Sequence, residues 1–346
     1  MNESNEWTRQ GRRQEKKKKK GRIGFIFILL LAIIAVAGTY YASRINSTIS
    51  SITQSVGNRT EEEANEIIKN AKPINILLLG IDNGAYGRTE EDGRSDTMLL
   101  LTINPSTKKS QLLSLPRDTY TEIVGTGGYD KLNHAFAYGK APMVINSVEK
   151  LLDTTIDFYV QINMEGLIEF VDAVGGIEVT SPLTFTYEGR SFVEGKTELL
   201  DGESALRFAR MRYDDPEGDY GRQKRQRIVI EELVKKLMTF NSVTNFEQLM
   251  NAVSKNVKTD LPIGQVMALK NTYGPALTGD NLTQAFMDER QLILTNNEGQ
   301  SVYYSYATDE VLLKTTNAIR TIQEEKTVTT YPLLEEREDL YYLTTP

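Results

Sequence analysis

The stretch INILLLGID, residues 74–82, decides the fold. Residues 74–81 form an apolar run of strand length, and Asp82 follows at the position where α/β sheets place ligand-binding groups. Two further apolar runs, residues 98–104 and 111–115, are joined by the turn sequence Asn104-Pro105-Ser106-Thr107. Strand-like runs then alternate with amphipathic segments along the chain. We therefore expect an α/β protein with a three-layer α/β/α domain.

The remaining elements follow from apolar spacing and from turn residues. Predicted helices cover residues 61–70, 142–152, 165–174, 202–212 with Asp201 as the cap, 222–240 and 308–324. Predicted strands cover residues 158–162, 177–180 and 302–306, with an extended segment near Leu292 and a hairpin of 184–187 and 191–193 around Gly189. We place the folded domain at residues 73–324, after a polar stalk (44–72) and before an acidic tail (325–346).

Composition excludes several kinds of chemistry. The 346 residues include no cysteine and one histidine, and the formal net charge is −7. Disulfides, thiol nucleophiles and Cys/His zinc sites are therefore excluded, and Ser-His-Asp catalysis is disfavoured. Any chemistry must use carboxylates, arginine, lysine, hydroxyl groups or a hard metal ion.

The first 43 residues predict a membrane anchor. Residues 1–22 carry nine basic and three acidic side chains, and residues 23–43 form an uncharged apolar stretch that is long enough to span a bilayer. Basic flanks stay in the cytoplasm, so we expect a single-pass signal-anchor helix, a cytoplasmic basic tail and an extracellular domain. A cleaved signal peptide, with Ala35-Val36-Ala37 as the cleavage pattern, is the alternative. A buried core helix or a nucleic-acid patch explains the segment less simply.

Two carboxylates form a candidate metal site. Asp82 ends the first strand, and Asp96 lies at the start of the second, within RSDTM. Pairing of these strands would bring both carboxylates together, and two carboxylates with room for water suit Mg²⁺ and a substrate phosphate. The simpler interpretation of either residue alone is an aspartate that caps a turn.

Charged residues also follow the third strand. Arg117 and Asp118 come directly after residues 111–115, and Lys131 and His134 lie in a predicted loop further on. A single histidine without metal-binding partners is weak evidence for catalysis, so a structural imidazole is the favoured interpretation of His134.

The densest basic region lies near residue 220. Arg210 and Arg212 stand near the end of one predicted helix, and Arg222, Arg225 and Gln226 share a face of the next at spacings of three and four. That face continues into apolar residues, so it points towards the core. Clustered guanidinium groups suit a diphosphate, because its oxygens accept bidentate hydrogen bonds. A solvated basic helix and a nucleic-acid surface are the alternatives.

Taken together, these motifs resemble the LytR-CpsA-Psr family of Gram-positive envelope proteins. The resemblance is carried by the ordered motifs LLLGID (77–82), RSDTM (94–98), SLPRDTY (114–120), KLNHAFAYG (131–139), VDAVGGIEV (171–179), LDGESAL (200–206), RMR (210–212) and GDYGRQKRQ (218–226). It covers residues 73–240 closely. The segment between Asp82 and Asp96 looks slightly longer than is usual in the family.

The resemblance implies a transferase of cell-wall assembly, which moves an anionic glycopolymer such as wall teichoic acid from undecaprenyl diphosphate to peptidoglycan. It implies that Asp82 and Asp96 hold Mg²⁺, with Mn²⁺ as a substitute. It also implies that the diphosphate is bound by Arg94, Arg117, Arg210, Arg212, Arg222 and Gln226, whereas Asp118, Lys131, Asp219 and Arg225 match the motifs without a clear role.

The expected reaction is phosphoryl transfer. A sugar hydroxyl of peptidoglycan attacks the sugar-linked phosphorus, Asp82 or Asp96 takes its proton, and Arg117 and Arg222 stabilise the charge with the metal. The expected partners are the lipid-linked polymer, peptidoglycan and the membrane, and not nucleic acid. The same residues would also serve a Mg²⁺-dependent lipid pyrophosphatase, and a non-catalytic anchored regulator or polymer-binding protein is a third hypothesis.

Overall fold

The computed structural model describes residues 60–82, 93–239, 251–252, 254–262, 266–296 and 298–331. Among these residues, no helix combines the length and the apolar character that crossing a membrane requires. The basic tail (1–22) and the predicted anchor (23–43) lie outside the described residues.

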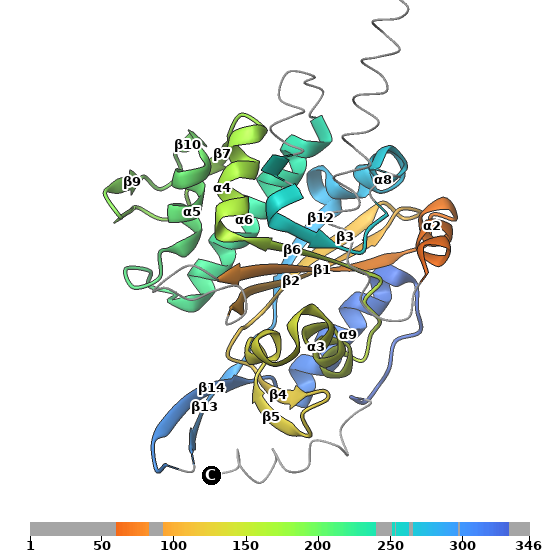
Figure 1. Cartoon of the computed structure of the whole chain (residues 1–346), viewed down its shortest axis with the longest axis vertical. Coiled ribbons are helices and arrows are strands. Elements are labelled where there is room, and N and C mark those ends of the chain that lie inside the picture. The colour runs from red at the N-terminus through yellow and green to blue at the C-terminus, as the bar shows by residue number, and fades with distance from the viewer. Residues whose placement is uncertain are drawn as a thin grey trace, which may run out of the picture. The chain divides into compact units, whose positions relative to one another are not determined.

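A six-stranded mixed sheet forms the centre of the domain (Figure 1). Strand β1 pairs antiparallel with β2 and parallel with β6, while β3 pairs antiparallel with β2 and parallel with β12. Strand β11 completes the sheet by antiparallel pairing with β6. The order across the sheet is β11 (Val257–Thr259), β6 (Phe158–Asn163), β1 (Ile74–Asp82), β2 (Arg94–Asn104), β3 (Lys109–Leu115) and β12 (Leu282–Phe286).

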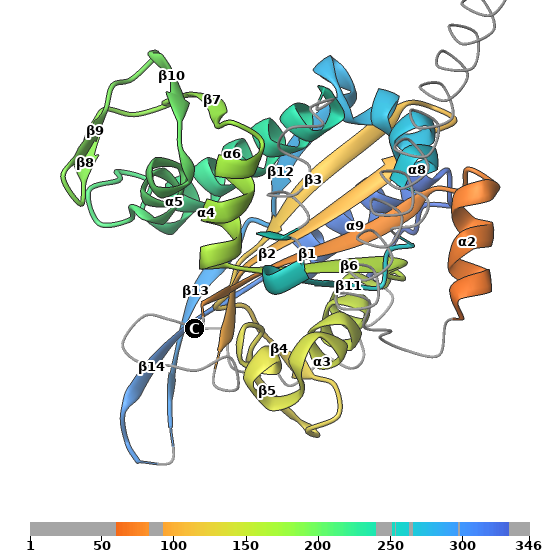
Figure 2. The same ribbon diagram turned by 45° about the horizontal axis from the view of Figure 1, so that its top comes forward.

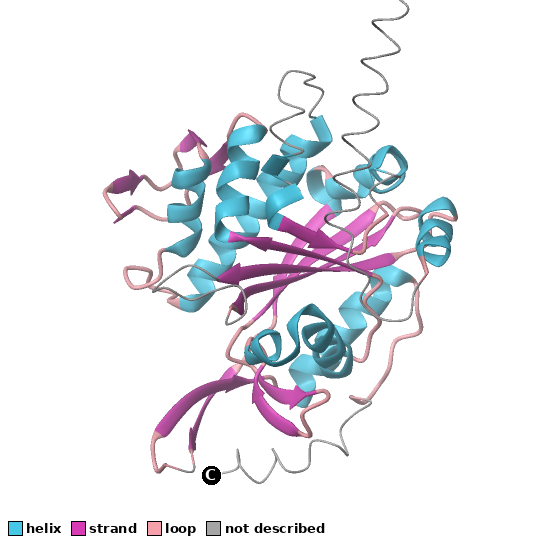
Figure 3. Cartoon of the chain, viewed as in Figure 1, coloured by secondary structure: helices cyan, strands magenta, loops and turns pink. Residues whose placement is uncertain are grey.

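Helices cover both faces of this sheet, and the colouring of Figure 3 shows the strands between helices. On one face, Leu77 and Leu79 of β1 pack with α3 (His134–Leu152) and α9 (Asp309–Gln323). On the other face, Ile76 and Leu78 pack with side chains of three helices. These helices are α2 (Glu61–Lys69), α6 (Asp219–Thr239) and α8 (Val266–Tyr273). Strands buried on both faces require continuous apolar runs, which β1 and β2 supply.

A second hydrophobic core lies beside the sheet, where α4 (Met164–Ala173), α5 (Gly202–Arg210) and α6 pack together (Figure 2). Two small sheets contribute to it. They are β7 (Ile177–Thr180) with β10 (Thr197–Leu200), and the hairpin β8 (Phe185–Tyr187) with β9 (Arg190–Phe192). Asp201 caps α5 by accepting a hydrogen bond from the Ser204 amide at 2.8 Å, as the sequence predicts.

Three helix boundaries differ from the prediction. Helix α3 begins at His134, so His134 is helical and not in a loop, and Lys131 ends strand β5 (Gly128–Lys131). Non-helical dihedral angles at Gly139 and Lys140 interrupt the apolar spacing of α3, which explains the late predicted start. Helix α5 ends at Arg210, and α6 starts at Asp219.

Two peripheral segments dock on the domain. Ala64 and Ile68 of α2 are buried, although α2 belongs to the predicted stalk. Tyr331, which belongs to the predicted acidic tail, is buried against α3 and donates a hydrogen bond to the Leu151 carbonyl at 2.8 Å.

Gly202 tests the packing of α5 on α4. A Cβ atom there would lie 2.6 Å from Ile168 Cα and nearer still to its carbonyl oxygen. Because a backbone neighbour cannot move aside, we expect Gly202→Ala to lower the free energy of unfolding by about 1–3 kcal/mol, measured by urea denaturation. The control is Gly128→Ala, where the nearest atom is 4.0 Å away. Equal unfolding midpoints for the two variants would contradict the close packing.

Candidate active site

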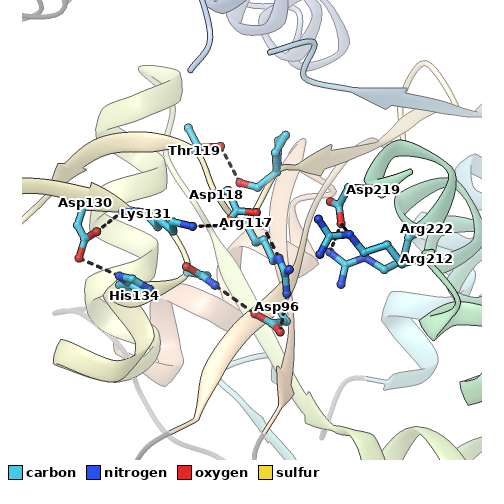
Figure 4. Close-up of polar contacts among 12 residues, drawn as sticks. Asp96, Arg117, Asp118, Thr119, Asp130, Lys131, His134, Arg212, Asp219 and Arg222 are labelled. Carbon is cyan, nitrogen blue, oxygen red and sulfur yellow. Dashed lines mark hydrogen bonds and ion pairs between the residues drawn. The ribbon is translucent and has the colours of Figure 1, made fainter. Parts of the chain in front are cut away.

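The strand directions bring the predicted charged residues to one edge of the sheet. Because β2 is antiparallel to β1 and β3, its amino end lies beside their carboxyl ends. Asp82 of β1 lies opposite Arg94 of β2, and Leu115 of β3 lies opposite Met98 of β2. Arg117 follows two residues after Leu115. Figure 4 shows the polar side chains that gather there. The strand pairing on which the Asp82 and Asp96 site depends is therefore present.

A β-bulge positions Asp96. Gly80 pairs with Thr97 but Ile81 pairs with Ser95, which leaves Asp96 as the extra residue of β2. Bulges of this kind redirect side chains near active sites. The Asp96 carboxylate accepts hydrogen bonds from Arg117 Nη1 at 2.9 Å and from Asn133 Nδ2 at 3.1 Å. Asn133 lies within a motif, yet nothing in the sequence indicated that it orients this carboxylate.

Arg117 lies between two carboxylates. Its Nη1 is 2.9 Å from Asp96 Oδ2, and its Nε is 3.5 Å from Asp118 Oδ2. Burial lowers the pKa of Arg117, but the charges of Asp96, Asp118 and Asp219 outweigh burial and raise the pKa above its ordinary value. Arg117 therefore keeps its positive charge despite being partly buried.

Asp219 holds two more arginines. Its Oδ1 is 2.8 Å from Arg222 Nη2 and 3.4 Å from Arg212 Nε. Burial raises the pKa of Asp219, but Arg222, a hydrogen bond from Gln223, Arg117 and Arg212 together lower it below the ordinary value. Burial is also the main cause that lowers the pKa of Arg222. Asp219 thus has a defined role, which is to fix these two guanidinium groups at the start of α6.

A pocket between α6 and the sheet joins these groups. Of the predicted site residues, Asp96, Arg117, Arg222 and Gln226 line it, together with Thr97, Met98, Leu99, Ser114, Leu115 and Gln223. Two guanidinium groups, those of Arg117 and Arg222, line the pocket against the single carboxylate of Asp96. Guanidinium groups form strong bidentate hydrogen bonds with phosphate and carboxylate oxygens, so this lining suits an anionic ligand.

Other predicted residues lie around this pocket. Asp82 is buried at the end of β1, and Arg94 is exposed at the start of β2. Arg210 ends α5 and makes no ion pair with a described residue. Gln223, which the sequence prediction missed, donates to Asp219 Oδ2 at 3.1 Å. Its helical spacing of four from Asp219 was the available signal.

Arg225 does not belong to the phosphate-binding group, although the helical spacing placed it on the same face. It is 1% exposed, pairs with Asp215, and donates to the carbonyls of Phe208 and Met211. Arg225 therefore holds the end of α5 and the following loop against α6. This loop contains Arg212, so Arg225 helps to fix the position of Arg212 without lining the pocket itself.

Two further predicted residues form an ion pair beside Arg117. Lys131 Nζ is 2.8 Å from Asp118 Oδ1.

His134 is held by a carboxylate outside the pocket. His134 Nδ1 is 2.8 Å from Asp130 Oδ2, which also accepts a hydrogen bond from the Tyr138 hydroxyl. His134 is absent from the pocket lining, and this geometry agrees with a structural imidazole.

Asp82 and Asp96, the predicted metal ligands, both lie at this edge of the sheet. No group of three or more His, Cys, Asp or Glu side chains with metal-binding geometry occurs among the described residues. Mg²⁺ is commonly held by one or two carboxylates, with water and substrate phosphate as its other ligands, so this pair is chemically suitable.

Fold and pocket together define a mixed α/β protein with an arginine-lined pocket at one edge of its central sheet. Residues 39–320 match the LytR_cpsA_psr family, and the chain belongs to this family.

Relatives with established names support the same assignment. The chain is 42% identical over 288 residues to the polyisoprenyl-teichoic acid–peptidoglycan teichoic acid transferase TagU of Enterococcus faecalis, covering 80% of this chain and 93% of the relative. Identity to TagU of Bacillus cereus is 37%, over 86% of this chain and 97% of the relative. The crystal structure of B. subtilis TagU is similar with a TM-score of 0.59 and 34% identity, over 74% and 99% of the two chains.

The buried pair of Arg225 and Asp215 offers a second stability test. Asp215→Asn would leave the Arg225 charge buried without its carboxylate, so we expect the free energy of unfolding to fall by about 3–5 kcal/mol. Thermal unfolding of the protein measures this loss. Asp214→Asn is the neighbouring control, because Asp214 is exposed. Similar melting temperatures for both variants would show that the buried pair does not hold the α5–α6 connection.

Proposed function

We propose that this protein transfers an anionic glycopolymer of the teichoic acid type from a polyisoprenyl diphosphate carrier to peptidoglycan. The observation that carries the proposal is the pocket lined by Arg117 and Arg222, two guanidinium groups against the one carboxylate of Asp96. Diphosphate oxygens accept the bidentate hydrogen bonds that guanidinium groups offer. The names of the TagU relatives support the polymer and the acceptor. A solved structure of TagT bound to LIIa-WTA, 25% identical, supports binding of such a substrate by this fold.

In the proposed reaction, an acceptor hydroxyl of peptidoglycan attacks the sugar-linked phosphorus and the polyprenyl phosphate leaves. Arg117 and Arg222 stabilise the charge on the phosphoryl oxygens, which is the main requirement of phosphoryl transfer. Arg94, Arg210, Arg212 and Gln226 bind the remaining diphosphate oxygens. The acceptor proton passes to Asp82 or Asp96.

We further propose Mg²⁺ as the cofactor, held by Asp82 and Asp96. When bound, the ion neutralises phosphate charge and orients the oxygens. The fixed position of Asp96, between Arg117 and Asn133, supports this role. We also propose that residues 23–43 anchor the protein in the cell membrane with the folded domain outside, on the basis of their apolar length and their basic flank.

Two alternatives share part of this evidence. A lipid pyrophosphatase would use the same pocket with water as the acceptor. A regulatory role is suggested by the description of a similar Enterococcus faecalis structure as a transcriptional regulator, with a TM-score of 0.66 and 38% identity over 80% of this chain and 95% of that chain.

Removal of the pocket arginines should abolish transfer. We expect Arg117→Ala and Arg222→Ala each to lower kcat by about 100- to 1,000-fold, as loss of a single charge-stabilising donor does elsewhere. The assay follows polymer attached to peptidoglycan from a purified lipid-linked donor, with and without acceptor. Release of polymer that does not depend on acceptor would identify a pyrophosphatase instead.

The matched control is Arg207→Ala. Arg207 pairs with Glu203 at 3.3 Å and with Glu188 at 3.7 Å on the surface of α5, and it does not line the pocket. Its loss should leave transfer unchanged. Full activity of Arg117→Ala and Arg222→Ala would refute the proposed site.

Metal dependence is tested by chelation. We expect EDTA to stop transfer and added Mg²⁺ to restore it, because one carboxylate pair must hold the ion in the proposed site. Asp96→Asn should weaken Mn²⁺ binding, measured by electron paramagnetic resonance, about tenfold or more, in line with the loss of a charged ligand. Asp130→Asn is the control, since Asp130 binds His134 and Tyr138. Undiminished transfer in EDTA would exclude the metal role.

A further inference from the structure

An exposed apolar ledge lies beside the arginine pocket. Eight large hydrophobic side chains are exposed among the described residues, and we call four of them the ledge: Tyr220 (37% exposed), Phe286 (49%), Ile293 (65%) and Tyr303 (44%). Tyr220 and Phe286 contact each other edge to face, with ring centroids 5.4 Å apart. Ile293 and Tyr303 are register partners in the hairpin of β13 (Arg290–Thr295) and β14 (Ser301–Tyr306). Exposed apolar side chains that cluster in this way mark binding surfaces.

The ledge is continuous with the site. Tyr220 follows Asp219 in the first turn of α6, and its hydroxyl donates to the Glu289 carbonyl at 3.1 Å. Burial raises the pKa of Tyr303, and so do the nearby groups of Asp118, Tyr220, Glu289 and Asp219, so Tyr303 lies close to Tyr220 and the two pairs adjoin. Two of these carboxylates also contact the pocket arginines. A ligand on the ledge would therefore lie next to the phosphate-binding groups.

The hairpin is fixed to the strand end that carries Arg117. The Ser305 amide donates to the Asp118 carbonyl at 3.0 Å, and Thr119 Oγ1 donates to Glu289 Oε1 at 2.7 Å. Lys131 Nζ binds Asp118 and lies 5.8 Å from the Tyr303 ring centre and 5.5 Å from that of Tyr304. Asp118 and Lys131, whose roles were unclear from the sequence, thus hold the ledge in place.

We propose that this ledge binds the pyranose rings of the peptidoglycan acceptor. The inference rests on the proposed function and adds to it the surface that receives the acceptor. A pyranose has an apolar C–H face that stacks on an aromatic ring and a polar rim that hydrogen-bonds, and tyrosine offers both kinds of contact. In-line transfer requires the acceptor to approach the phosphorus from the side opposite the leaving group, so an open surface next to the pocket is needed.

Charge favours this occupant over two others. Acidic side chains (Asp118, Asp288 and Glu289) and basic side chains (Lys131 and Arg227) both border the ledge, so their charges largely balance and give a polymer with a phosphate in each repeat no net attraction. An anionic membrane surface gains no net attraction for the same reason. Uncharged N-acetylhexosamine rings need none, because they bind by stacking and hydrogen bonding.

Binding of a neutral sugar probe tests the ledge without any donor substrate. The full-length protein in detergent is titrated with chitotetraose and with lysozyme-digested peptidoglycan fragments, followed by saturation-transfer NMR. We expect the double substitution Ile293→Ala/Tyr303→Ala to weaken binding about tenfold, the effect of losing one or two stacking contacts. Tyr303→Phe keeps the ring and should retain affinity within about twofold.

The matched control is Leu199→Ala. Leu199 is 60% exposed on β10, a strand of a different sheet. In the transfer assay, the double variant should raise KM for the acceptor about tenfold while KM for the lipid-linked donor stays constant. Unchanged sugar affinity in the double variant, or an equal loss in Leu199→Ala, would overturn the proposal.

The absence of cysteine permits a direct test for a membrane at the ledge. Ile293→Cys gives a unique site for an environment-sensitive fluorophore, and Leu199→Cys is its control. In phosphatidylglycerol and phosphatidylcholine proteoliposomes, added peptidoglycan fragments should change the emission at position 293 alone. Quenching at position 293 by nitroxide-labelled lipid, without a response to glycan, would overturn the proposal. Ledge-dependent glycan binding in a protein that transfers no polymer would refute the proposed function and leave the ledge intact.

Discussion

The antiparallel pairing of β2 with both β1 and β3 is the constraint on which the site depends. It places the amino end of β2, with Arg94 and Asp96, between the carboxyl ends of two strands that lead to Asp82 and Arg117. Three chain segments therefore deliver charged side chains to one edge of the sheet. The bulge opposite Gly80 and Ile81 sets the position of Asp96, because it leaves Asp96 without a partner on β1. The Asp96 carboxylate accepts hydrogen bonds from Arg117 and Asn133 instead.

The second half of the site is organised by buried charges. A buried ion pair contributes little net stability, but it enforces a particular geometry because any other arrangement leaves a charge unpaired. Arg225 and Asp215 act in this way between α5 and α6, while Asp219 orders Arg212 and Arg222 above the sheet. Gly221 is required here, since a Cβ atom at this position would overlap the Asp215 carboxylate.

Much of this arrangement could be predicted from the sequence, and the exceptions have physical causes. Apolar runs predicted β1, β2 and β3, with Asp96 and Arg117 near their ends. The family resemblance grouped Arg117 with Arg222 and Gln226, and all three line the pocket. The direction of Arg225 could not be predicted. At about 3.6 residues per turn, successive residues differ by about 100° around the helix axis, and only the packing of α5 decides which neighbour each one meets.

Local irregularities of the backbone and single long-range contacts could not be predicted from the sequence either. The positive φ of Lys140 interrupts the apolar spacing of α3. The first turn of this helix, which contains His134, was therefore predicted as a loop. The role of Asn133 depends on a contact across 37 residues of sequence, for which a single sequence offers no signal. The family resemblance identified the correct motifs but did not separate residues that contact the ligand from residues that support them.

The position of α2 has a consequence for access to the pocket. Helix α2 packs where β1 begins, whereas the charged pocket lies where β1 ends (Figure 1). Nine residues of strand separate these points by about 30 Å at the usual rise per residue. The docking of α2 and the gathering of charged side chains thus use opposite ends of one strand, so the contact that holds α2 on the sheet does not cover the pocket.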